Sequence, residues 1–162
     1  MEQQPIPRIE LYVRSLLPDG AHERQETVIE RLQEFSQTDR IEGFSVIAWG
    51  KQIAPESAAA ATEEGRYILN RIAEFKQWAL SNTVSLESFY QRRTVASEAS
   101  DGTYRAIRLP VMGMAEYVGD ELRHVAPCTS GDVVHTIVKR LDQIESGVAM
   151  ERGPGVDSAP FA

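Results

Sequence analysis

Cys128 is the only cysteine of the chain, and a thiol next to a predicted helix could act as a nucleophile or as a metal ligand. His124 and His135 lie on either side of it and could serve as a base or as further ligands. Zinc sites usually need three or four ligands at recognisable spacing, and this set is a weak match. We therefore interpret Cys128 as a small buried residue. We expect no enzyme activity, no catalytic residue, no metal and no cofactor.

Arg92, Arg93 and Arg105 form the best basic cluster of the chain, close to the aromatic residues Phe89 and Tyr90. Guanidinium groups bind phosphates, and aromatic rings stack on the bases of nucleic acids. The same residue types also cover the edge of a hydrophobic core, where an arginine stacks on a ring. The cluster is thus the alternative candidate for a nucleic-acid contact, with core packing as the competing interpretation.

The chain has 162 residues, 42% of them hydrophobic, and a net charge of −7. This length and composition predict one globular domain with a hydrophobic core. The negative charge argues against nucleic acid as a partner, although it leaves room for a local basic face. No apolar run is long enough to span a membrane, and the N-terminus lacks the pattern of a signal peptide. We expect a cytoplasmic protein without a membrane partner.

Hydrophobic periodicity predicts alternating strands and helices, in the order β-α-β-α, an extra segment, then β-β-α. The predicted strands are 8–15, 43–53, 104–109, 109–118 and 121–126, and the predicted helices are 22–37, 62–81 and 131–145. Residues 1–7 are expected to form a flexible lead, residues 8–146 a single α/β domain, and residues 147–162 a disordered tail.

Pro110 precedes a buried strand, a Gly119-Asp120 turn, a second strand and the last helix. This succession resembles the C-terminal half of the thioredoxin-like fold, and the opening strand and its turn into a helix resemble glutaredoxin-type chains. The resemblance implies a mixed sheet and a cis bond at Pro110. A ferredoxin-like α+β sandwich is the alternative fold for the same elements.

In the thioredoxin-like family, the first helix opens with a reactive cysteine pair. The matching segment here contains Leu17 and Pro18 and no thiol, so dithiol exchange is excluded at this place. The resemblance implies that Leu17, Pro18, Arg108, Leu109 and Pro110 surround a vestigial site that binds a partner.

Three segments are similar to small haloarchaeal proteins, some of which are labelled helix-turn-helix proteins: Glu-Leu-Tyr-Val-Arg-Ser at 10–15, Leu-Pro-Val at 109–111 and His-Val-Ala-Pro-Cys at 124–128. The composition is similar too, because only three of the 17 basic residues are lysines. A helix-turn-helix needs two consecutive helices joined by a tight turn. Periodicity predicts a strand after helix 22–37 and an extended segment after helix 62–81, and thus no such motif.

The main hypothesis is a non-catalytic thioredoxin-like module that binds or regulates a protein partner in a salt-adapted archaeon. The alternative is a DNA-binding, transcription-associated protein. A gel-shift assay with DNA separates the two hypotheses, because only the alternative predicts a salt-dependent shift in the mobility of the DNA.

Overall fold

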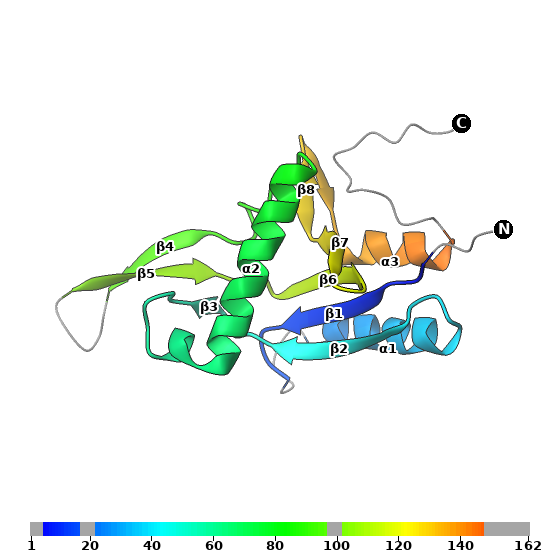
Figure 1. Cartoon of the computed structure of the whole chain (residues 1–162), viewed down its shortest axis with the longest axis horizontal. Coiled ribbons are helices and arrows are strands. Elements are labelled where there is room, and N and C mark those ends of the chain that lie inside the picture. Colours follow the sequence, from blue (N-terminus) through cyan, green and yellow to red (C-terminus); the bar gives the residue numbers. More distant parts are fainter. Residues whose placement is uncertain (1–4, 17–21, 97–101, 148–162) are drawn as a thin grey trace.

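The structure, a computed structural model of the chain, describes residues 5–16, 22–96 and 102–147. Its centre is a four-stranded mixed sheet of order β2-β1-β6-β7 (Figure 1). These strands are β1 (Arg8–Val13), β2 (Gly43–Ala48), β6 (Met112–Val118) and β7 (Glu121–Ala126). β1 is parallel to β2 and antiparallel to β6, which is in turn antiparallel to β7.

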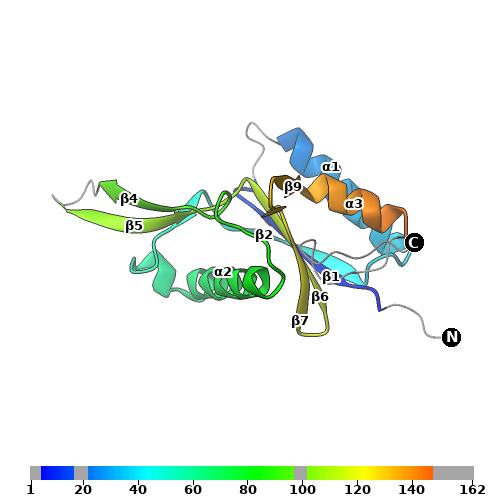
Figure 2. The ribbon, with the colours of Figure 1, turned by 90° about the horizontal axis from the view of Figure 1, so that it is seen from above.

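Helices cover both faces of this sheet (Figure 2). The α-helices are α1 (His22–Gln37), α2 (Glu63–Ser81) and α3 (Ile137–Glu145). Alternate residues of β1 point to opposite faces. Leu11 packs with Leu32 of α1 and Leu141 of α3, whereas Tyr12 packs with Phe75 of α2. The sheet is therefore the middle of three layers, with α1 and α3 on one side and α2 on the other.

The predicted mixed α/β fold is confirmed at this level, and the finer expectations are not. Among the described residues the cis peptide bond joins Ala126 to Pro127, so the expectation of a cis bond at Pro110 was wrong. A ferredoxin-like sandwich has two layers, whereas helices here flank both faces of the sheet. The tail predicted for residues 147–162 lies almost wholly outside the described residues.

Threonine side chains cap the N-terminal ends of α2 and α3. Thr62 caps α2, because its hydroxyl oxygen accepts a hydrogen bond from the Gly65 amide at 3.0 Å. The last helix begins later than the predicted residue 131, with Thr136 as its cap. Residues before it form a short hairpin, β8 (Cys128–Ser130) and β9 (Val133–His135), in which Gly131 has a positive φ of 60°.

A buried ion pair fixes α2 to its face of the sheet. The guanidinium of Arg71 donates two hydrogen bonds to the Glu10 carboxylate, at 3.0 and 2.8 Å, and Glu10 is 3% exposed. Tyr12 and Arg8 also donate to this carboxylate. Burial raises the pKa of Glu10, but the hydrogen bonds from Arg71, Tyr12 and Arg8 outweigh it and hold the pKa at about 2.

A second buried ion pair fixes α3 to the opposite face. Arg140 donates two hydrogen bonds to the Glu116 carboxylate, at 2.7 and 3.0 Å, and Glu116 is fully buried. Fork-to-fork pairing of this kind is the strong geometry for an arginine and a carboxylate. The sheet thus carries one bidentate pair on each face, and each pair joins a β-strand to a helix.

Candidate nucleic-acid interface

A two-stranded ribbon is the extra segment of the fold, and it projects away from the three layers in both views (Figures 1 and 2). It is made of β4 (Arg92–Ala96) and β5 (Thr103–Arg108), which pair antiparallel from Arg92↔Ile107 to Ala96↔Thr103. The short strand β3 (Gln52–Ile53) pairs with the other edge of β5 and anchors the base of the ribbon.

Burial changes along the ribbon from base to tip. Ile107 and Ala106 are 7% and 1% exposed and join the core, whereas Thr103, Tyr104 and Arg105 are exposed. Because cross-strand partners share a face, Arg92 and Arg105 lie on one side of the ribbon and Arg93 on the other. The three arginines expected in one cluster therefore share one element and divide between its two faces.

The described part of the ribbon is basic and contains no acidic residue. Its strands carry Arg92, Arg93, Arg105 and Arg108, all exposed. Within the described residues none of their four guanidinium groups has a hydrogen bond or an ion pair. α1, in contrast, carries four glutamates and two arginines. The described part of the ribbon is thus positive, on a chain whose net charge is −7.

For Tyr90 the competing interpretation of core packing is confirmed, because Tyr90 is a core residue. It is 3% exposed and packs edge-to-face on Trp49 and Phe75, with ring centroids 5.8 and 6.3 Å apart. A base could not stack on it without opening the core. The exposed aromatic residue of the ribbon is Tyr104, on the same face as Arg93. The alternation of residues 104–109 was the signal that could have identified it.

In the described part of the vestigial site expected around Pro110, two backbone carbonyls accept hydrogen bonds from side chains. The Leu109 carbonyl accepts a hydrogen bond from Arg14 at 2.6 Å, and the Pro110 carbonyl accepts one from Trp49 at 3.3 Å. Leu109 itself is fully buried. Arg108 is exposed and belongs to the ribbon. Leu17 and Pro18 lie outside the described residues.

Cys128 is buried, in agreement with its interpretation as a core residue. Burial raises the pKa of its thiol to about 12, which leaves almost no thiolate at neutral pH. His135 is its cross-strand partner in the β8–β9 hairpin. His124 is 8% exposed and packs against Trp78. Among the described residues, no three His, Cys, Asp or Glu side chains are grouped as a metal site would require.

None of the described helices has the length and apolar character that crossing a membrane requires. No feature of the described residues tests the protein partner that the main hypothesis expects, so this partner stays a prediction.

A family model described as a helix-turn-helix domain matches residues 1–149. Searches of curated proteins and of solved structures found no match. The family match overturns the resemblance to thioredoxin-like proteins and agrees with the helix-turn-helix label of the haloarchaeal proteins. It also favours the DNA-binding alternative over a thioredoxin-like binding module. In the described residues α1 is followed by β2, and α2 by β4, so the family name does not itself point to a recognition helix. By a match over most of its length, the chain belongs to this helix-turn-helix domain family.

Proposed function

We propose that this protein is a DNA-binding, transcription-associated protein that contacts the duplex with the β4–β5 ribbon. Membership of a helix-turn-helix family supports the class of function. The observation that carries the assignment to the ribbon is its set of four exposed arginines without a carboxylate partner in the described residues.

The shape of the ribbon suits a groove of DNA. The major groove is about 12 Å wide and admits either an α-helix or a two-stranded β-ribbon. Strands of five and six residues extend roughly 17–20 Å, enough to follow several base pairs. A ribbon in the groove turns one face to the base edges, and arginines at its margins reach the phosphates. Arginines on both faces allow base and backbone contacts at once.

The helices are poorer candidates for this contact. α1 presents Glu23, Glu26, Glu30 and Glu34 along 16 residues, and carboxylates at these positions would repel the phosphates. α2 carries equal numbers of acidic and basic residues. Arg71 of α2 and Arg140 of α3 are held in the ion pairs with the sheet. Their guanidinium groups are therefore not free to bind phosphate.

The expected single domain and the expected cytoplasmic location are also part of this proposal. Residues 8–146 act as one domain, so the ribbon is held by the same core that the helices cover. A protein that binds chromosomal DNA in an archaeon acts in the cytoplasm, where that DNA lies. High salt there would shorten the Debye length to about 3 Å at 1 M, so direct contacts would outweigh the repulsion of the overall charge.

The test is fluorescence anisotropy with a labelled duplex and two double variants of equal charge. R93Q/R105Q removes one arginine from each face of the ribbon, and R24Q/R40Q removes two exposed arginines in and after α1. We expect R93Q/R105Q to weaken binding at least about tenfold, because each phosphate or base contact contributes about 1 kcal/mol or more. We expect R24Q/R40Q to bind like the unmodified protein. Equal losses in both variants would contradict the assignment to the ribbon.

A further inference from the structure

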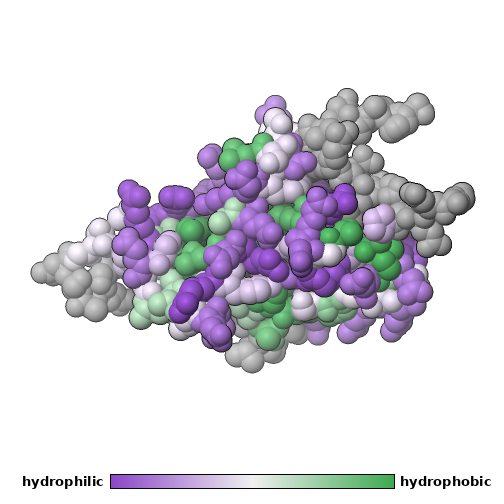
Figure 3. All heavy atoms as spheres, viewed as in Figure 1, coloured by the Kyte–Doolittle hydropathy of each residue, from purple (hydrophilic) through white to green (hydrophobic). Residues whose placement is uncertain are grey.

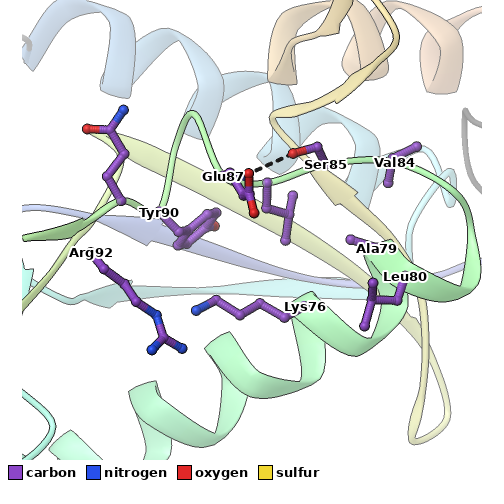
Figure 4. Close-up of a pocket in the computed structure, with 10 residues that line it drawn as sticks. Lys76, Ala79, Leu80, Val84, Ser85, Glu87, Tyr90 and Arg92 are labelled. Carbon is purple, nitrogen blue, oxygen red and sulfur yellow. Dashed lines mark hydrogen bonds between the residues drawn. The ribbon is translucent and has the colours of Figure 1, made fainter.

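A cavity of about 870 Å³ lies between α2, the segment at 84–87 and the start of β4 (Figure 4). Its size falls within the range of small-molecule sites. Leu80, Val84, Leu86 and Tyr90 supply an apolar wall. Figure 3 shows small apolar areas among hydrophilic residues in the region between α2 and β4. Leu86 and Tyr90 are buried and Leu80 is 77% exposed, so the cavity can cover one side of an apolar group.

Two cations also line this cavity. Lys76 comes from α2 and is half-buried, and Arg92 is the first residue of β4. Figure 4 shows the Lys76 side chain extending through the cavity toward Arg92. Neither has a hydrogen bond or an ion pair within the described part of the chain. Glu87 is the acidic residue of the lining, and it is exposed.

The two cations disfavour one another in the free protein. Burial lowers the pKa of Lys76, the nearby charge of Arg92 lowers it further, and the carboxylate of Glu87 raises it in part. A ligand carboxylate between them would remove both penalties, since it would supply hydrogen-bond acceptors and the opposite charge. The two neighbouring cations thus favour an anion as the ligand, and the wall beside them favours an apolar body.

We propose that this cavity binds a small organic carboxylate with an apolar body, of the size of a medium-chain fatty acid. The carboxylate lies between Lys76 and Arg92, and the hydrocarbon packs on Leu80, Val84 and Leu86. The site does not require DNA, because its cations and its apolar wall are present in the free protein.

Arg92 belongs to both the cavity and the ribbon, which couples the two sites. This consequence rests on the proposed function. A carboxylate bound to Arg92 neutralises one of the four ribbon arginines, so it lowers the affinity for DNA. By linkage, DNA lowers the affinity for the carboxylate by the same factor.

The site is tested by calorimetric titration of the full chain with octanoate in the absence of DNA. Octanamide is the uncharged comparison ligand, and K76Q, R92Q and the neighbouring R93Q are the variants. We expect saturable binding of octanoate that K76Q and R92Q each weaken about tenfold or more, with R93Q unchanged. Octanamide should bind much more weakly. Circular dichroism checks that K76Q is folded, and R92Q is exposed and tests the same site.

Three results would overturn the site: no saturable octanoate binding, equal binding of octanoate and octanamide, or binding that R92Q leaves unchanged. The coupling has its own readout, the affinity for labelled DNA with and without octanoate. Octanoate that binds the protein but leaves DNA affinity unchanged would refute the coupling and leave the cavity site standing. A protein that binds octanoate and no DNA would refute the proposed function alone.

Discussion

The four-stranded sheet and the β4–β5 ribbon use arginine in opposite ways. On the sheet, Arg71 and Arg140 are each locked to a buried carboxylate by two hydrogen bonds. On the ribbon, four exposed arginines have no such partner among the described residues. A paired guanidinium fixes a helix to a sheet, whereas an unpaired one remains able to bind an external anion. The same residue type is structural in one region, and we propose that it is functional in the other.

The difference is energetic as well as geometric. A buried ion pair has lost its water, and removing one partner leaves an uncompensated charge in the core. An exposed arginine keeps its water until a ligand replaces it, so its substitution costs the fold little. The two regions should therefore respond in opposite senses when stability and DNA binding are measured side by side.

The largest expected effect is on the sheet side. Arg140→Ala leaves Glu116 buried without its partner, and we expect a loss of about 3–5 kcal/mol in the free energy of unfolding, measured with urea. Arg31→Ala is the matched control, because it breaks surface ion pairs to Asp142 and Glu145 at 3.0 and 2.7 Å. That control should cost at most about 1 kcal/mol. Equal losses in both variants would show that the Glu116 pair is not a core anchor.

The second effect concerns Glu10, whose pKa of about 2 lies below its ordinary value of 4.5. The folded state prefers the ionised carboxylate, so this stabilisation is complete above pH 4.5 and is lost as the pH falls toward 2. Glu10→Gln should lower stability at neutral pH by about 1.5–3 kcal/mol, because hydrogen bonds to a charge are lost. Urea unfolding across this pH range should then show a shallower acid decline in E10Q than in the unmodified protein. An unchanged decline would mean that other carboxylates control it.

The third effect is also a pH dependence, in a different window. Burial lowers the pKa of His124 to about 4, from an ordinary 6.5. The unfolded chain binds the proton more readily, so stability should fall by about 1–3 kcal/mol as the pH drops from 6.5 to 4. His124→Gln should remove this part of the decline in urea unfolding curves. If the slope between pH 6.5 and 4 is the same in both proteins, His124 is not buried in its neutral form.

The smallest effect is expected on the ribbon. R93Q/R105Q should change the free energy of unfolding by no more than about 0.5 kcal/mol, because neither side chain has a side-chain partner among the described residues. Thermal unfolding of the double variant beside the unmodified protein checks this. A clear loss of stability would show that the ribbon arginines support the fold, and the contrast between the two regions would fail.

Sequence patterns correctly predicted the structural features that depend on residues close together in the chain. Helix 22–37 and the Gly119-Asp120 turn were both confirmed. The helix rests on periodicity and the turn on a glycine with positive φ, and both signals act within a few residues. The basic segment at 92–105 was also visible in the sequence, although its division between two faces of a ribbon was not.

Sequence patterns missed what depends on contacts between distant segments. Glu10 and Arg71 are 61 residues apart, and nothing local marks them as a pair. Tyr90 was placed with the arginines because it is close in sequence, while its ring packs on Trp49 and Phe75. The last helix was started too early because Val134 fits a helical period as well as a strand.

The salt dependence of DNA binding is the most direct test of the claim that the ribbon arginines contact DNA. The logarithm of the binding constant falls with the logarithm of salt concentration, with a slope of about −0.9 for each phosphate neutralised. Between about 50 and 200 mM KCl, R93Q/R105Q should show a slope shallower by about 2, and R24Q/R40Q a slope equal to that of the unmodified protein. An unchanged slope in R93Q/R105Q, or a loss in R24Q/R40Q instead, would place the DNA contact elsewhere on the molecule.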